Sequence, residues 1–209
     1  IRKYENKFNH KIYIIQDVAH SFGAKWHGKL VTTFGDAAVF GLNISKIINS
    51  IFGGMVITND VDTFKNLKSF RAKIIKGNRF IKSINRMFYY FSVRIAFHPT
   101  IYPIIDYLEK KQLLNSFTKY YEDDKIYFPK DWDSKPTNTE AVVGLTQLKK
   151  YDDIIYKRIK FSLHIKEKYS NCKGITFMPH IDGTTYSHCV ALVKDREEWI
   201  KEYRKKGVQ

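Results

Sequence analysis

The sequence predicts an α/β fold in which a mostly parallel sheet is followed by a small α+β domain near the C-terminal end. Three apolar segments indicate the strands of the larger sheet, namely Lys11–Gln16, Asp36–Leu42 and Gly53–Thr58. Near-continuous apolar runs are typical of parallel strands that are covered on both faces. Two further strand-like segments, Gly174–Met178 and Tyr186–Val193, indicate the smaller domain.

Helices and turns are expected between these strands. The polar segment Ile1–His10 is predicted to end a helix that leads into the first strand. The segment Phe22–Thr33 is predicted to form a turn or short hairpin because it contains two glycines. After the third strand, Asn59-Asp60 are expected to turn the chain into a helix that runs to about Lys73.

The segment Ile74–Lys130 is rich in aromatic and basic residues. Its apolar residues fall near helical spacing: Ile84, Met87, Phe88, Phe91 and Ile95. Our interpretation is an amphipathic helix pair that packs on its own domain or across a dimer. The alternative is a membrane-surface helix within residues 79–117, because such helices interleave basic residues with aromatic ones.

A long helix is expected after Pro136, with Thr137 or Asn138 as its N-cap and Glu140 in its first turn. Its predicted buried stripe consists of Val142, Leu145, Leu148, Ile154, Ile155 and Ile159. A turn is expected at Asp182-Gly183, and the segment KDREEWIKEYRKKG predicts a final helix. These elements suggest three parts, residues 1–75, 76–135 and 136–209.

Two residues of the first part point to a specific chemistry. Asp17 follows an apolar strand, where open α/β sheets place ligand-binding groups. Lys46 lies among apolar and small residues, where desolvation disfavours an ammonium ion and favours a nucleophilic amine. Enzymes that use pyridoxal 5'-phosphate (PLP) need a Schiff-base lysine and an acidic partner for the pyridinium nitrogen. Taken alone, Asp17 also fits a turn or helix-cap residue and Lys46 a solvated surface charge.

Three segments in this order, QDVAHSFGA, GDAAVFGLNISK and FGGMVITND, resemble the DegT/DnrJ/StrS family of PLP-dependent sugar aminotransferases. A weaker match, TNTEAVVGLTQL, is similar to the start of a helix in that family. The resemblance implies a PLP-dependent transferase of fold type I with a small C-terminal domain. It also implies that about half of the family's usual polypeptide would precede Ile1 and that its final strands would follow Gln209.

The resemblance assigns roles to individual residues. Lys46 would be the catalytic lysine that anchors the cofactor and then moves a proton, whereas Asp17 would face the pyridine nitrogen. Ala19 would let the ring lie against the chain, and His20 would reach the phenolic oxygen of the cofactor. Some relatives have histidine in place of Lys46 and run sugar dehydrations, so lysine favours amino transfer.

Two positions depart from the family's pattern. Gly41 occupies the position of a phosphate-contacting serine, so Asn43 and Ser45 are candidates to supply the missing donor. Asp133 occupies the position of an asparagine that reaches the neighbouring subunit's cofactor phosphate, and Lys135 stands where arginine is usual. An acid beside a phosphate would be repulsive. We therefore keep Gly41, Asn43 and Ser45 as expected cofactor-binding residues and do not assign Asp133 to the site.

The resemblance also implies a nucleotide-linked keto-sugar as substrate, glutamate or glutamine as amino donor, and a homodimer. The net charge of +15 is spread along the chain, so we expect no nucleic-acid partner, and some of it can attract the substrate's pyrophosphate. Cys172 and Cys189 show no zinc or disulfide spacing and fit a cytoplasmic protein, and His180 and His188 have no acid or cysteine at ligand spacing. We therefore expect no metal. Two alternatives stay open: a PLP-dependent sugar dehydratase and a non-catalytic paralogue of the same fold.

Overall fold

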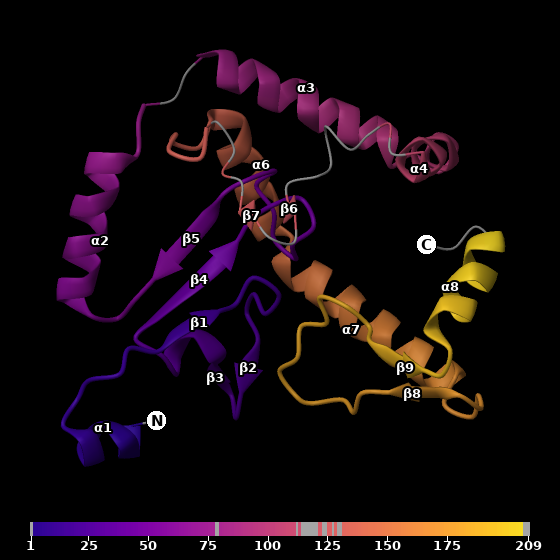
Figure 1. Cartoon of the computed structure of the whole chain (residues 1–209), viewed down its shortest axis with the longest axis horizontal. Helices are drawn as coiled ribbons and strands as arrows, with labels where there is room; N and C mark the ends of the chain where they lie inside the picture. Colours follow the sequence, from indigo (N-terminus) through magenta and orange to yellow (C-terminus); the bar gives the residue numbers. More distant parts are fainter. Residues whose placement is uncertain are drawn as a thin grey trace.

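The computed structural model describes residues 2–77, 80–111, 113, 121–122, 125–126, 128 and 131–206 (Figure 1). The elements in chain order are α1 (Arg2–Phe8), β1 (Ile15–Asp17), β2 (Lys25–Trp26), β3 (Lys29–Leu30), the short 3-10 helix η1 (Val31–Thr33), β4 (Ala37–Gly41), β5 (Gly54–Ile57), α2 (Val61–Ile74), α3 (Phe80–Ala96), α4 (Tyr102–Lys110), β6 (Tyr121–Glu122), β7 (Lys125–Ile126), α6 (Asn138–Lys149), α7 (Tyr151–Lys168), β8 (Ile175–Phe177), β9 (Ala191–Val193) and α8 (Arg196–Lys205).

The larger sheet has the strand order β1-β4-β5 among the described residues. Strand β1 is parallel to β4, with Asp17 opposite Val39, and β5 is antiparallel to β4. All three predicted strands are present, but each is shorter than its apolar segment. The first strand begins only at Ile15, because the Ile14 N–H donates to the Asp36 carboxylate (2.7 Å) rather than to a neighbouring strand.

The expected burial of these strands on both faces is wrong for this chain. Ile15 and Val56 are exposed, and so are Phe64 and Phe70 of α2. The buried cluster at the sheet is small and consists of Val18, Ala38 and Phe40 with Phe22 and Val31 packed against them. Further apolar side chains of the described chain are buried outside this cluster, namely Ile47, Ile48, Ile51 and Tyr186. Among the described residues, the helices therefore leave much of the sheet uncovered.

The connections around the sheet follow the prediction. Strands β2 and β3 form the hairpin expected within Phe22–Thr33. Helix α2 begins after Asp60, whose carboxylate accepts a hydrogen bond from Thr63 N–H (2.7 Å). Hydrogen bonding to the Thr63 side chain, and secondly to the Thr63 backbone N–H, holds the pKa of Asp60 below its ordinary value.

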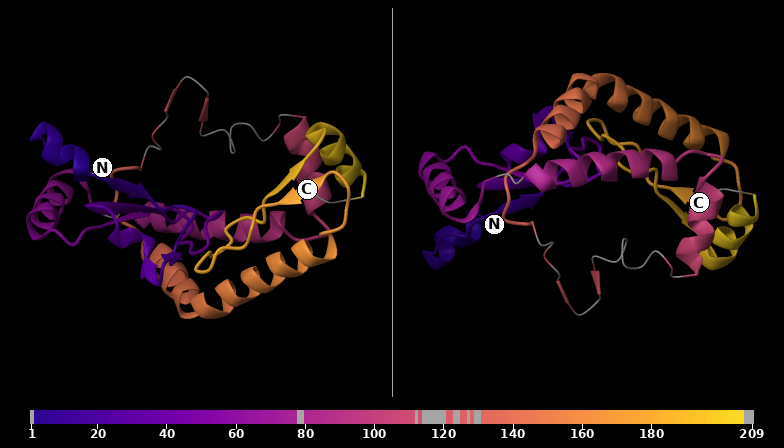
Figure 2. Two further views of the ribbon diagram at one scale, coloured as in Figure 1. Left: turned by 90° about the horizontal axis from the view of Figure 1, so that it is seen from below. Right: turned by 90° about the horizontal axis from the view of Figure 1, so that it is seen from above.

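Helices α3 and α4 form the aromatic and basic part of the chain, as the apolar spacing predicts. Helix α3 runs along one edge of the molecule and contacts α6, and α4 lies at its far end (Figures 1 and 2). Residues 79, 112 and 114–117 of the suggested membrane-surface segment lie outside the described residues. Within the described parts of the chain, none of the helices has the length and apolar character needed to cross a bilayer.

The long helix expected after Pro136 is two helices, α6 and α7, that meet at Lys150. The predicted N-cap is correct. The Thr137 hydroxyl accepts from Glu140 N–H (3.2 Å), and Glu140 accepts from Thr137 N–H (2.7 Å), which completes a capping box. The break at Lys150 lets Tyr151 reach the large sheet, where its ring lies 5.7 Å from that of Phe22.

The predicted buried stripe of this helix is wrong for its first half. Val142, Leu145 and Leu148 are exposed, whereas the isoleucines of α7 are half-buried. Helix α6 instead turns Gly144 towards the loop before β5, where a side-chain carbon at this glycine would lie 3.1 Å from Ser50 Cβ. The close approach therefore places the apolar stripe of α6 on the outside.

The C-terminal part contains the two expected strands, β8 and β9, which pair antiparallel, followed by α8. The views in Figure 2 place this part at the opposite end of the molecule from the β1-β4-β5 sheet, with α7 connecting the two. The glycine expected to end the last helix, Gly207, lies outside the described residues. The domain boundaries stay a prediction.

Candidate active site

The loop between β4 and β5 carries Lys46 and is closed at its base by backbone hydrogen bonds. Leu42 N–H donates to Gly53 O (2.9 Å), and Ser50 N–H donates to Leu42 O (2.8 Å). Three isoleucines of the loop are buried: Ile47, Ile48 and Ile51. Lys46 itself is half-buried. The apolar neighbours seen in the sequence thus anchor the loop and fix where the lysine emerges.

Lys46 meets His20 at the carboxyl end of the parallel strands. Its Nζ lies 2.7 Å from His20 Nε2, although the two residues are 26 positions apart in the chain. Gly41 lies directly beneath, since a side-chain carbon there would be 3.3 Å from Lys46 Cε and 3.4 Å from Ala19 Cβ. The structure therefore brings together Ala19, His20, Gly41 and Lys46. A serine at position 41 would have to displace the lysine's aliphatic stem.

Asp17 stands at the end of β1, as predicted, and its carboxylate is exposed. One of its oxygens, Oδ1, accepts a hydrogen bond from Ala19 N–H (3.0 Å). This hydrogen bond gives Asp17 the turn-forming role that was the alternative to cofactor binding. The same bond shapes the turn that presents Ala19 and His20 to Lys46.

Asn43 and Ser45 precede Lys46 on its loop and contact each other. Asn43 Oδ1 accepts from both Ser45 Oγ (2.8 Å) and Ser45 N–H (3.3 Å). The Ser45 hydroxyl therefore stabilises the loop itself. Whether either side chain holds a phosphate stays a prediction.

His188 is one of the two histidines for which the sequence predicts no metal-binding role. It is exposed, but its ring lies 5.2 Å from the ring of His20, and its Nδ1 lies 3.1 Å from Ser187 Oγ. The C-terminal part thus reaches the lysine site. The sequence contains no signal for this contact, because positions 20 and 188 are joined only by the fold.

The loop that presents His188 is held from two sides. Tyr186 is buried, and its hydroxyl lies 2.9 Å from Lys166 Nζ and 2.8 Å from His180 Nδ1. Arg158 donates to the carbonyl oxygens of Tyr186 (3.2 Å) and Ser187 (3.1 Å). The loop is therefore positioned by helix α7.

A pocket of about 300 Å³ lies between this loop and the β2–β3 hairpin, and His20 and His188 are both in its wall. The pocket is closed on one side where Lys25 N–H donates to Gly183 O (2.9 Å). Gly183 has a φ of +87°, and a side-chain carbon there would lie 2.3 Å from Lys25 O. This close approach needs glycine. Lys25 and Trp26 also line the pocket, which therefore has a basic and an aromatic residue in the same wall as His20, the residue that contacts Lys46.

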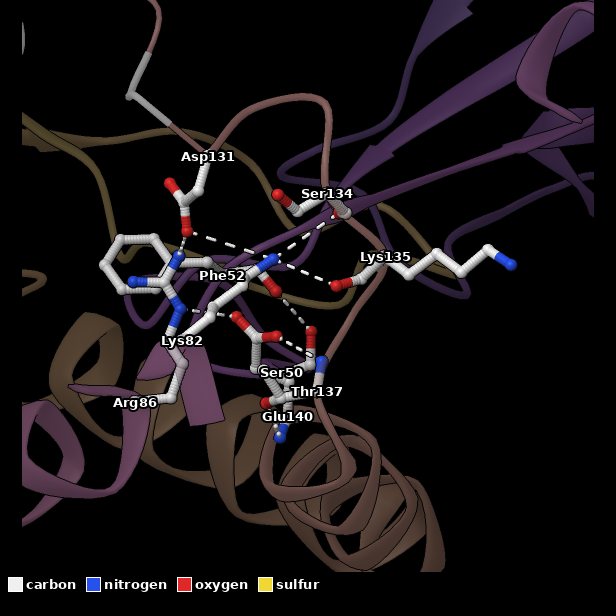
Figure 3. Close-up of polar contacts among 9 residues, drawn as sticks. All are labelled: Ser50, Phe52, Lys82, Arg86, Asp131, Ser134, Lys135, Thr137 and Glu140. Atoms are coloured by element: carbon white, nitrogen blue, oxygen red, sulfur yellow. Dashed lines mark hydrogen bonds and ion pairs between the residues drawn. The ribbon is translucent and has the colours of Figure 1, made fainter. Parts of the chain in front are cut away.

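A second polar cluster joins α3 to the start of α6 (Figure 3). Arg86 forms ion pairs with Asp131 and with Glu140 (2.7 Å for the latter), and its guanidinium lies 4.3 Å from the centre of the Phe52 ring. Lys82 donates to the carbonyl oxygens of Ser134 (3.4 Å) and Lys135 (3.0 Å). These contacts fix the segment that precedes α6.

Asp133, at the position of the family's phosphate-reaching asparagine, lies in that segment. Its carboxylate is 2.5 Å from Lys76 Nζ and is mostly buried. The expected repulsion between the Asp133 carboxylate and a phosphate would therefore be reduced by the ammonium group of Lys76. Lys135 is exposed, and its ammonium points away from the cluster in Figure 3. Among the described residues, we find no group of three metal-binding side chains.

Comparison with known proteins identifies relatives of this chain. Residues 1–95 match the model of the DegT/DnrJ/EryC1/StrS aminotransferase family. The GDP-perosamine synthase of Escherichia coli O157:H7 is 37% identical over 68 residues, which are 32% of this chain and 19% of that protein.

Solved structures resemble the whole chain. The sugar aminotransferase CalS13 from Micromonospora echinospora has a TM-score of 0.65 at 13% identity, and the match covers 99% of this chain and 46% of that one. The E. coli GDP-4-keto-6-deoxy-D-mannose-3-dehydratase with bound hydrated PLP has a TM-score of 0.63 at 17% identity, covering 100% and 48%.

The chain spans less than half the length of the relatives and structures that match it from end to end. The matched family region contains Asp17, Ala19, His20 and Lys46. Residues 1–95, a little under half of the chain, thus resemble the DegT/DnrJ/EryC1/StrS aminotransferase family, and the whole chain shares the α/β fold of the solved sugar aminotransferase and sugar dehydratase structures.

Proposed function

We propose that this chain carries the lysine-bearing part of a PLP-dependent sugar aminotransferase. The enzyme would move an amino group from glutamate or glutamine to a nucleotide-linked keto-sugar. The observation that supports this most directly is the 2.7 Å contact between Lys46 Nζ and His20 Nε2 at the strand ends where Asp17 stands. An amine, a second basic nitrogen and a carboxylate at one strand edge suit proton transfer on a bound amino acid.

The residues at this edge fit the proposed cofactor. Lys46 supplies a primary amine for covalent attachment, and Asp17 supplies an exposed carboxylate for the pyridine nitrogen. Ala19 and Gly41 are small, which leaves the approach to Lys46 free of bulky side chains. When bound, PLP supplies an electron sink for the carbanion that forms at the donor's α-carbon.

The chain's own residues would accept and return the proton of the donor's α-carbon. Lys46 would take the proton from the α-carbon of the amino donor and later deliver it during amino transfer. His20 Nε2 lies within hydrogen-bond distance of Lys46 Nζ, so it would help to position the amine. Asp17 would keep positive charge on the ring nitrogen by a charge-assisted hydrogen bond.

The pocket beside Lys46 suits an anionic sugar nucleotide. Lys25, His20 and His188 line it together with Trp26, so that the lysine and the two imidazoles can hydrogen-bond a pyrophosphate and an aromatic ring can face a base or sugar. We propose that amino-sugar supply for a surface polysaccharide, such as an O-antigen, or for another deoxyamino-sugar product, is the pathway. The enzyme would act in the cytoplasm as a homodimer.

Two alternatives are tested against the structure and the comparisons. A sugar dehydratase is supported by the structural likeness to the E. coli dehydratase. The lysine at position 46 disfavours a dehydratase, because the resemblance places histidine at this position in such enzymes. A non-catalytic paralogue was suggested by Gly41 and Asp133. The packing of Gly41 under Lys46 and the ion pair of Asp133 with Lys76 give both residues a structural explanation.

Borohydride reduction in the presence of PLP tests the lysine. We expect a stable phosphopyridoxyl group on the peptide that contains Lys46, detected by mass spectrometry, and none in Lys46→Ala. Lys68→Ala, a change of an exposed lysine on α2, is the matched control and should label like the wild type. Labelling that is absent, or that survives in Lys46→Ala, contradicts the proposal.

Product analysis separates the enzyme classes. The enzyme is incubated with glutamate and a panel of nucleotide-linked keto-sugars, and the products are weighed by mass spectrometry. An amino-sugar product supports transamination, whereas a deoxygenated keto-sugar without nitrogen supports dehydration. A labelled lysine without any product over the whole panel supports the paralogue.

A further inference from the structure

A buried tyrosine ties together the two ends of the loop that presents His188. Tyr186 is 8% exposed, and its hydroxyl accepts a hydrogen bond from Lys166 of α7 (2.9 Å). The same ammonium group donates to the carbonyl oxygen of Met178, directly after β8 (2.7 Å), and lies 4.8 Å from the centre of the Tyr186 ring. The Tyr186 hydroxyl also lies 2.8 Å from His180 Nδ1. One side chain of α7 therefore holds both the beginning and the end of this loop.

The bonding capacity of these groups determines where their hydrogens lie. An ammonium ion can only donate, so the Tyr186 oxygen accepts from Lys166. The phenol has a single hydrogen of its own, and His180 Nδ1 is an acceptor within its reach. His180 then carries its hydrogen on Nε2, which lies 3.5 Å from Asp182 Oδ1. In this arrangement the buried hydroxyl both donates and accepts, as a buried polar group requires.

The backbone of Tyr186 is held in an unusual conformation. Its φ is +47°, in the left-handed region that a residue with a bulky side chain rarely enters. Arg158 of α7 donates to the carbonyl oxygens of Tyr186 (3.2 Å) and Ser187 (3.1 Å). Strained conformations of this kind persist where the surrounding contacts determine them. Side-chain and backbone contacts to the same helix thus act together at Tyr186.

The turn at Tyr186 leads directly to the lysine site. His188 follows two positions later, and its ring lies 5.2 Å from the ring of His20. His20 Nε2 in turn lies 2.7 Å from Lys46 Nζ. His20 and His188 are both exposed, so the contact between their rings depends on how their two loops are held. The Tyr186 hydroxyl is thus connected to the Lys46 amine through a short stretch of backbone and a pair of imidazole rings.

We propose that Tyr186 is a positioning residue for the Lys46 site. Its hydroxyl, bonded on two sides, fixes the loop so that His188 packs against His20 and restricts how the His20 imidazole meets the amine. Tyr186 lines the pocket beside this loop, but its hydroxyl is engaged by neighbouring side chains and acts through His188. The relevance of this contact to amino transfer rests on the proposed function, whereas the contact itself is tested without cofactor.

Nuclear magnetic resonance of the histidine side chains of the full chain tests the proposal in the absence of PLP. Spectra that correlate ring hydrogens with ring nitrogens distinguish a nitrogen that carries a hydrogen from one that does not, and we expect His180 to carry its hydrogen on Nε2. Tyr186→Phe keeps the buried ring and removes only the hydroxyl, so it should shift the ring signals of His188 and His20. The matched control, Tyr156→Phe, removes an exposed hydroxyl on α7 and should leave both signals in place.

Two variants at His180 separate positioning from general destabilisation. Asparagine offers an oxygen near the place of Nδ1 that can accept from the Tyr186 hydroxyl, whereas leucine offers no acceptor. His180→Leu should therefore shift the His188 signals as Tyr186→Phe does, and His180→Asn should leave them closer to their wild-type positions. This pair decides the question if Tyr186→Phe does not fold.

The effect on the reaction is measured with PLP and with glutamate and glutamine as amino donors. Tyr186→Phe should keep the borohydride labelling of Lys46 but slow amino transfer to bound PLP by about 10-fold or more, since a small misplacement of reacting groups can cost about 100-fold. The proposal is overturned if the histidine signals or the transfer rate of folded Tyr186→Phe match the wild type, or if His180→Asn and His180→Leu shift the signals equally. It is also overturned if His180 carries its hydrogen on Nδ1. Absent labelling of the wild type would instead overturn the proposed function and leave the histidine result standing.

Discussion

The ion-pair cluster between α3 and α6 makes a quantitative prediction about stability. Arg86→Met keeps most of the aliphatic volume but removes the guanidinium. Glu140 then loses its cation in a site where its side chain is 3% exposed, and Phe52 loses the charge stacked on its ring. The capping box between Thr137 and Glu140 stays in place. The variant therefore isolates the cost of an unpaired buried carboxylate.

The magnitude follows from burial. Removing one partner of a buried ion pair costs about 3–5 kcal/mol. Arg86 is 16% exposed and its second partner, Asp131, is 31% exposed, so solvent reduces the loss at that end. The stacking on Phe52 adds about 0.5–1 kcal/mol. We expect a loss of about 3 kcal/mol in the free energy of unfolding, or a Tm about 6–12 °C lower for a chain of this size.

Urea unfolding followed by circular dichroism measures this loss. Adding Glu140→Gln to Arg86→Met should restore about 2 kcal/mol, because glutamine removes the charge and still completes the capping box. Lys157→Met is the control, since it breaks an exposed ion pair with Asp153 and should cost less than about 0.5 kcal/mol. A loss below about 1 kcal/mol for Arg86→Met, or an additive loss in the double variant, would refute the reasoning.

Three further outcomes are expected. Gly183→Ala should destabilise the protein by at least about 1 kcal/mol more than Gly28→Ala in the same urea assay. Both glycines have a positive φ, but only Gly183 faces the Lys25 carbonyl. Equal losses of stability for the two variants would show that the loop relaxes. Burial raises the pKa of the Tyr151 phenol, with a nearby carboxylate adding to the effect, so the folded state favours the neutral form. The contribution of the neutral Tyr151 phenol to stability is complete below its ordinary pKa of 10.0 and is lost as the pH rises through the higher pKa of the folded state. The Tm of the wild type should therefore fall more steeply above pH 10 than the Tm of Tyr151→Phe. Parallel curves of Tm against pH would contradict this prediction. Thr137→Ala should cost about 1 kcal/mol by thermal unfolding, because it removes a fully buried N-cap, and an unchanged Tm would show that the cap is dispensable.

Local features of the fold were predictable because their causes lie within a few residues. Apolar runs located β1, β4 and β5, and the sequence placed the N-cap of α6 at Thr137 or Asn138 with Glu140 in the first turn, where the structure has Thr137. In the aromatic and basic segment, Phe80–Ala96 and Tyr102–Lys110 are helical as expected, whereas Tyr121–Glu122 and Lys125–Ile126 pair as short strands. These features depend on side-chain periodicity and capping, which neighbouring residues determine.

The candidate site was predictable in part. Asp17 and Lys46 were singled out from their surroundings in the sequence, whereas Ala19, His20 and Gly41 were assigned by the resemblance. The parallel pairing of β1 with β4 explains why the positions after these strands meet. A strand end is a shared edge, so residues that follow two parallel strands come together. Their roles towards PLP remain part of the proposal.

The sequence by itself determined where the strands, the lysine loop and the helix starts lie, because each depends on local pattern. Only the tertiary structure decided that His188 approaches His20, that Asp133 is paired with Lys76, and that the apolar face of α3 points outwards. These outcomes depend on ion pairs and packing between residues far apart in the chain. Periodicity shows that a helix has two faces, but only the partners of Arg86 decide which face is turned towards the protein.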